Sequence, residues 1–123
     1  IDEANRVWNG LDEVLAKHGY VRNGNYYAAV SPNEDTLAFF CHFGVTCVML
    51  SHLLGISPMI LWHGFCAAPT SVTSLITEER RKGVALFRMN AFSDTAHLFA
   101  NHEEPAFAAR FCETFANQEQ RHD

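Results

Sequence analysis

The chain has 123 residues, of which 48% are hydrophobic and 19% are charged, and its formal net charge is −5. This length and composition are those of one ordinary globular domain with a substantial apolar core. The acidic balance argues against nucleic acid or an anionic membrane as the partner. No apolar run reaches the roughly 20 residues that span a bilayer, and the first residues do not have the pattern of a signal peptide.

Four cysteines lie within or beside apolar segments: Cys41, Cys47, Cys66 and Cys112. Their spacing matches no zinc or haem pattern. We therefore predict free thiols in a reducing, cytoplasmic environment. His63 with Cys66, and the adjacent Cys41 and His42, do not complete a set of four converging ligands, so no metal is expected.

Residues 1–18 have the pattern of an amphipathic helix. Its apolar positions recur at three- and four-residue intervals: Ile1, Ala4, Val7, Trp8, Leu11, Val14 and Leu15. Acidic residues at the start and Lys17 near the end suit the helix dipole. Gly19 is a suitable C-terminal stop.

The next stretch predicts two short strands. Residues 23–25 form a turn, residues 26–30 read as a strand, and residues 31–35 have strong turn chemistry. The apolar run 37–41 is bounded by turn signals, which predicts a strand buried on both faces. These two strands would form either a hairpin or two neighbours in a sheet.

A helix that is apolar nearly all round, and therefore buried, is expected from Val45 to Leu54, ended by Gly55. The remaining elements follow from turn signals and alternation. They are an irregular stretch at 58–68, a hairpin of strands 71–77 and 84–89, a loop at 92–99, and a helix that begins near Pro105.

His42 is the candidate functional residue, because it follows the predicted strand 37–41 and precedes a helix. Ligands of open α/β folds bind at this edge of the sheet, and the free N–H groups of a helix N-terminus attract anions. Gly44 would present such an N–H to phosphate. A strand-capping role for His42, and a tight strand-to-helix turn at Gly44, are the structural alternatives.

Four motifs occur in order between Leu37 and Leu98. They are Phe40-Cys41-His42-Phe43-Gly44, Ser51-His52-Leu53-Leu54-Gly55-Ile56, Thr70-Ser71-Val72-Thr73-Ser74-Leu75 and Asp94-Thr95-Ala96-His97-Leu98. This ordered set resembles the histidine phosphatase (phosphoglycerate mutase-like) superfamily. The resemblance implies an α/β fold, as part of a three-layer α/β/α sandwich with a mostly parallel sheet. Residues 1–123 would then be the C-terminal portion of one such domain, without the family's first strand.

The family's signature is an Arg-His-Gly motif whose histidine accepts the phosphoryl group, and this sequence does not contain it. The tail, residues 121–123, does not match the motif, and the chain begins at Ile1 rather than at methionine. We therefore expect the C-terminal half of such a protein, with only His42 of the family's core pocket. Phe43 stands where the family has a glycine, and Val45 and Cys47 stand where it has threonine and arginine.

The resemblance implies phosphoryl transfer through a phosphohistidine, with no metal or organic cofactor. Hydrolysis of a phosphorylated small molecule is the favoured reaction, with phosphomutase action as the related one. The nucleophile would lie outside this chain, which should be inactive alone. His42 would hold the phosphoryl group, while His52, His63 and His97 are read as structural.

Two other functions remain open: a non-catalytic phosphatase-like binding or assembly domain, and an unrelated α/β domain whose motifs are coincidental. The unrelated domain predicts no open pocket at His42. The apolar strand 37–41 needs a neighbour on each side. The expected protein partner is therefore the missing N-terminal half or a second copy of the chain.

Overall fold

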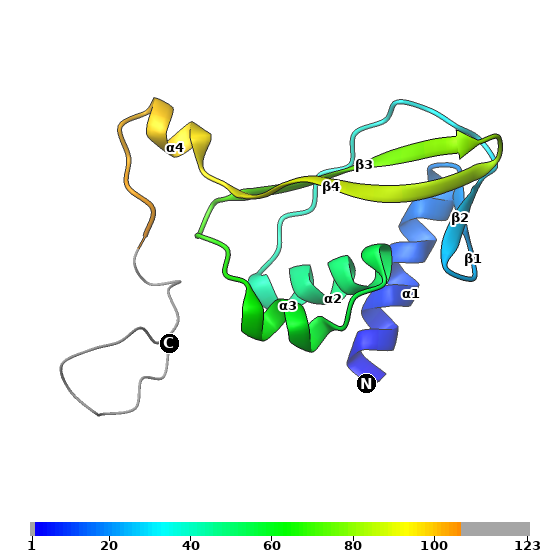
Figure 1. Ribbon diagram of the computed structural model, residues 1–123, viewed down its shortest axis with the longest axis horizontal. Coiled ribbons are helices and arrows are strands. Elements are labelled where there is room, and N and C mark those ends of the chain that lie inside the picture. Colours follow the sequence, from blue (N-terminus) through cyan, green and yellow to red (C-terminus); the bar gives the residue numbers. More distant parts are fainter. Residues whose placement is uncertain (1, 107–123) are drawn as a thin grey trace.

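A computed structural model describes residues 2–106 of the chain. The elements are α1 (Asp2–Lys17), β1 (Tyr20–Asn23), β2 (Tyr26–Ala29), α2 (Phe43–Leu54), α3 (Pro58–Gly64), β3 (Val72–Arg81), β4 (Val84–Asp94) and α4 (Ala96–Ala100). Figure 1 shows α1, α2 and α3 on one side of the long β3–β4 ribbon, with α4 beyond the far end of that ribbon.

The strands form one sheet in the order β1-β2-β4-β3, and every neighbouring pair in it is antiparallel. The first hairpin runs from the pair Tyr20–Ala29 to the pair Asn23–Tyr26. At the centre of the sheet, Tyr27 lies opposite Ala85. The prediction of a three-layer sandwich with a mostly parallel sheet is therefore wrong. The architecture is an antiparallel sheet with helices.

The turns explain the antiparallel arrangement. Gly24 and Gly83 lie in the two hairpin turns with φ of 65° and 82°, and each turn returns the chain directly onto the preceding strand. A direct return produces antiparallel neighbours, whereas parallel neighbours need a long crossover. The chain has a long connection between β2 and β3, but β4 lies between these two strands in the sheet.

The predicted buried strand at residues 37–41 is also wrong. This stretch has no regular secondary structure, Phe40 is 97% exposed, and Phe39 is 48% exposed. Only Leu37 packs against the core. A run of apolar residues becomes a strand only where another strand accepts its hydrogen bonds, and the sheet is completed here by β1, β2, β3 and β4.

The core lies between the helices and the sheet, in two clusters. The first joins α1 to the first three strands of the sheet order and consists of Leu11, Leu15, Tyr20, Tyr27, Ala29 and Ala85. The second joins α2 to α3 through Cys47, Leu50 and Leu61. The helix predicted at residues 1–18 is confirmed as α1, which buries Leu11 and Leu15 of the predicted apolar stripe and half-buries its other described members.

The helix predicted at residues 45–54 is confirmed as α2, which begins two residues earlier, at Phe43. Gly55 ends it in the left-handed region at φ 72°, with its N–H donated to Ser51 O. The helix is less buried than its composition predicts, because Val45 is 41% exposed. The end signal was correct because a left-handed C-terminal residue favours glycine.

The irregular stretch predicted at residues 58–68 is partly wrong, since its first half forms α3. Pro58 begins this helix, and the hydroxyl of Ser57 accepts a hydrogen bond from the Met59 N–H at 3.3 Å. Serine before a first-position proline is a local helix start signal. Most of its seven residues are apolar, but only Leu61 is buried.

The hairpin predicted from strands 71–77 and 84–89 is confirmed as β3 and β4, and both strands extend beyond the expected limits. The predicted loop at 92–99 is instead the end of β4 followed by α4. The predicted strand at 26–30 is β2, and its partner β1 was not predicted. Most of the helix predicted from Pro105 lies outside the described residues.

Candidate functional site

His42 lies immediately before α2, as the sequence predicts, with φ −103° and ψ 170°. Its carbonyl accepts hydrogen bonds from the Thr46 N–H at 3.0 Å and the Thr46 hydroxyl at 2.9 Å. Its imidazole is exposed and caps no amide of the helix. The first turn of α2 contains no acidic residue, so an exposed imidazole lies beside the positive end of a helix dipole.

Gly44 lies in the first turn of α2, where the ring of Trp62 packs against it. A Cβ atom at position 44 would come within 3.0 Å of two ring carbons of Trp62. Phe43 meets the same ring edge-on, with 6.4 Å between the ring centroids. The structure thus gives Gly44 a packing role that the sequence did not suggest, in which a glycine lets α3 approach α2.

Two cysteines near His42 have opposite environments. Cys41 is exposed, and its sulfur lies 3.3 Å from the Thr46 hydroxyl. Cys47 is 1% exposed, and burial raises the pKa of its thiol above the ordinary value. A raised pKa leaves less thiolate at a given pH, which makes Cys47 a weak nucleophile.

This difference predicts the pattern of thiol alkylation. At about pH 8, iodoacetamide should modify Cys66, which is exposed as Cys41 is, at least roughly tenfold faster than the buried Cys47, because only thiolate reacts and, of these two thiols, only Cys66 is accessible. Peptide mass spectrometry of a labelling time course measures the two rates. Equal rates for both thiols in the folded protein would contradict the placement of Cys47 in the core.

Two of the other histidines lie on helices other than the one that His42 precedes. His97 lies on α4, beyond the end of the β3–β4 ribbon in Figure 1, and its carbonyl accepts a hydrogen bond from Asn101 Nδ2 at 2.8 Å. His63 is exposed on α3. Within residues 2–106, no three His, Cys, Asp or Glu side chains converge as a metal site would require.

A polar cluster that sequence reasoning missed joins α1, α2 and the first hairpin. The Tyr27 hydroxyl donates to Asp12 Oδ1 at 2.5 Å, and His52 Nε2 lies 2.8 Å from Asp12 Oδ2. Arg22 Nη1 donates to the Tyr27 hydroxyl at 3.3 Å and to the His52 carbonyl at 3.0 Å. Burial and the Asp12 carboxylate raise the pKa of Tyr27 well above its ordinary value.

Trp8 completes this cluster as a contact between two helices. Its indole N–H donates to the Val48 carbonyl at 2.8 Å, and its ring stacks on His52 with 5.3 Å between centroids. The members are far apart in the sequence, and no local pattern marks their meeting. A cavity of about 460 Å³ beside the cluster is lined in part by Arg22 and His52. Arg22 contacts the Tyr27 hydroxyl, which in turn contacts the Asp12 carboxylate, and it also contacts the negative C-terminal end of α2. Because these groups already balance its positive charge, the cluster serves the packing of α1 on α2.

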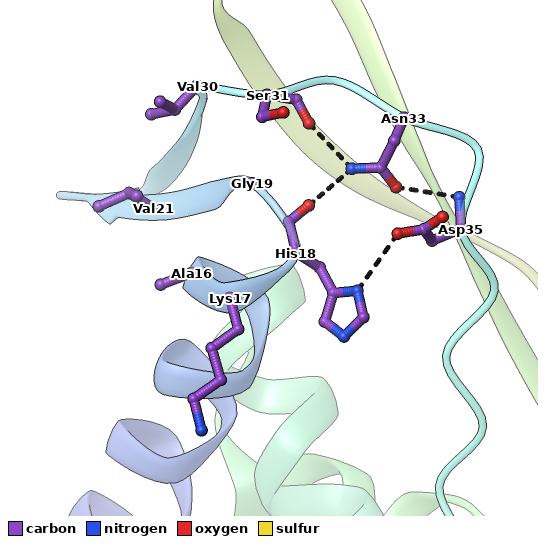
Figure 2. A pocket seen from close by; sticks show the side chains of 9 residues that line it. All are labelled: Ala16, Lys17, His18, Gly19, Val21, Val30, Ser31, Asn33 and Asp35. Carbon is purple, nitrogen blue, oxygen red and sulfur yellow. Dashed lines mark hydrogen bonds and ion pairs between the residues drawn. The ribbon is translucent and has the colours of Figure 1, made fainter.

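A second cavity, of about 420 Å³, lies where α1 meets β1 (Figure 2). Asn33 Nδ2 donates to the carbonyls of His18 and Ser31 at 2.7 and 2.8 Å, and the Asp35 N–H donates to Asn33 Oδ1 at 3.0 Å. His18 Nδ1 lies 3.3 Å from Asp35 Oδ2. These hydrogen bonds and the contact between His18 and Asp35 hold the connection after β2 against the end of α1. Neither cavity is lined by His42.

The chain gives no significant match to any protein-family model, curated protein or solved structure. The resemblance to the histidine phosphatases therefore rests on the ordered motifs in the sequence. In the part of the chain that the structure describes, no helix has both the length and the apolar character needed to cross a membrane.

Proposed function

We propose that this chain contributes His42 to a phosphoryl-transfer site of the histidine phosphatase type. The observation that supports the proposal is the position of His42, whose exposed imidazole directly precedes α2 in a motif that stands first in the ordered set of four. Backbone N–H groups at a helix start favour a phosphate dianion, and a ring N–H of an imidazole can donate a hydrogen bond to a phosphate oxygen.

In the proposed reaction, a histidine outside these 123 residues attacks the phosphorus of a phosphate monoester. The P–O bond to the alcohol breaks, and an acidic group that also lies outside these residues protonates the leaving oxygen. Water then attacks the phosphohistidine and releases inorganic phosphate. His42 holds the oxygens of the phosphoryl group during both steps and stabilises the negative charge that they carry in the transition state. The reaction needs no metal or organic cofactor from this chain.

The missing nucleophile provides the first test. The 123-residue chain contains no Arg-His-Gly motif, so it should not hydrolyse p-nitrophenyl phosphate. A natural polypeptide that contains both this chain and the motif should hydrolyse it. Turnover by the purified chain that is abolished by His42→Ala would contradict this division of the site. The matched comparison is the same assay on both proteins at equal concentration.

A non-catalytic binding or assembly role is the second candidate. His42 lines neither of the two cavities described above, which agrees with this role and equally with an unrelated domain whose motifs are coincidental. The sequence that precedes these residues in the natural polypeptide separates the two functions. An Arg-His-Gly motif within about one hundred residues upstream, the length that would complete a typical domain, supports the enzyme. A natural polypeptide without the motif supports the binding role.

A further inference from the structure

The connection between β2 and α2 contains an apolar segment, Leu37–Cys41, that we call the open segment; Leu37 packs against the core, and the residues after it are exposed. In Figure 1 it belongs to the cyan connection that reaches α2 from the first hairpin. Its side chains at Phe39 and Phe40 are 48% and 97% exposed. Within residues 2–106, its N–H and C=O groups make no backbone hydrogen bond. Unpaired backbone with apolar, strand-favouring side chains is a template for pairing with another strand.

We propose that the open segment is a self-pairing strand through which two copies of this chain form a dimer. A twofold axis at Phe39 would align the two segments antiparallel, with Leu37 of one copy opposite Cys41 of the other. Ala38 of each copy would then lie opposite Phe40. The same surface meets itself in such an interface, which is the usual symmetry of homodimers.

Charge favours a second copy as the occupant. No Asp, Glu, Lys or Arg lies between Thr36 and Ser51, so the paired segments bring no like charges together. The antiparallel register places Asp35 of one copy near His42 and the start of α2 of the other. That helix end has no acidic residue of its own, and Asp35 remains 57% exposed although it contacts His18. A carboxylate is favourable at a helix N-terminus, and the symmetry provides this contact twice.

The surface beside the open segment adds area to the interface. Trp62, which packs on Gly44, is 42% exposed, and Val45 on the first turn of α2 is 41% exposed. The exposed parts of Phe40 and Trp62 alone offer on the order of 300 Å² per copy. Phe39, Val45 and the paired backbone add to this area, and an interface smaller than the roughly 800 Å² per partner of stable complexes is typical of a weak, concentration-dependent dimer.

The dimer stands independently of the phosphoryl-transfer function. The two inferences meet only at the start of α2, where a phosphate held by His42 would compete with Asp35 of the second copy. Catalysis and dimerisation are therefore measured by different experiments, and either proposal can be contradicted while the other stands.

The test is the molar mass of the protein in solution over a concentration series, measured by sedimentation or light scattering. The unmodified chain should dimerise, and Phe40→Asp should weaken dimerisation by roughly tenfold or more, because it removes the most exposed apolar side chain of the interface. The matched control is Phe99→Asp. Phe99 is 85% exposed on α4, and its replacement should leave the dimer unchanged. Circular dichroism checks that both variants are folded.

A second variant tests the register. Leu37→Cys should form an intermolecular disulfide with the native Cys41 under mild oxidation, and the same change combined with Cys41→Ser should not. A monomer at every concentration would overturn the proposal, as would equal effects of Phe40→Asp and Phe99→Asp. A natural polypeptide that stays monomeric while the amides of the open segment resist hydrogen exchange would also overturn it, because its own chain would then be the occupant.

Discussion

Replacing His42 with alanine in the natural polypeptide should lower kcat/KM for p-nitrophenyl phosphate by about 100-fold to 1,000-fold, the usual effect of removing one preorganised donor to a transition-state charge. The side chain is exposed and makes no hydrogen bond to the helix that it precedes. The substitution therefore removes a functional group without disturbing the core. A loss mainly in kcat would indicate that His42 acts in the transition state.

His63→Ala is the matched control for this experiment, because His63 is also exposed and lies on the neighbouring helix α3. It should retain the activity of the unmodified protein. His42→Asn, which keeps a hydrogen-bond donor without the imidazole ring, should have intermediate activity. If His42→Ala kept the full activity of the unmodified protein, the imidazole would not hold the phosphoryl group.

Gly19→Ala should be the most destabilising of the conservative glycine substitutions, by about 2–4 kcal/mol of the free energy of unfolding. Gly19 ends the turn after α1 at φ 93°, and an added Cβ would lie 2.3 Å from the Ser31 carbonyl oxygen. The Gly19 carbonyl accepts hydrogen bonds from the N–H groups of Val30 and Ser31 at 2.9 and 3.1 Å. Any shift that relieves the clash disturbs both bonds.

Gly24→Ala isolates the backbone strain from this clash. Gly24 also has a positive φ, of 65°, but no atom lies within 4 Å of the position of an added Cβ. Gly24→Ala should lower the free energy of unfolding by only about 1 kcal/mol. Urea unfolding of the two variants measures the difference, with the slope of each transition checked for two-state behaviour. Equal losses would contradict the close approach of the connection after β2 to the end of α1.

Local signals predicted most of the regular elements correctly. The apolar period of residues 1–18, the stop at Gly55 and the turn before Gly83 each depend on a few neighbouring residues, and α1, α2 and the β3–β4 hairpin follow from them. The helix α3 also had a local signal, Ser57 followed by Pro58. It was missed because its aromatic and apolar residues resemble an irregular core segment.

The candidate site was predictable only at one residue. The place of His42 before a helix follows from the sequence, because both the apolar helix and its first residues are local features. The contacts among Asp12, Tyr27, Arg22 and His52 were not predictable, since these polar residues come from separate elements and each alone reads as a solvent-facing side chain.

The sequence by itself determined where α1 and α2 form, where two tight turns occur, and that one histidine precedes an apolar helix. Only the tertiary structure decided how the two hairpins join into one sheet, and it placed β2 beside β4 in an antiparallel sheet, not the parallel sheet that the family resemblance implied. It also left Leu37–Cys41 unpaired. The physical reason is that a helix satisfies its own backbone hydrogen bonds, whereas a strand exists only when a partner, distant in the sequence, supplies them.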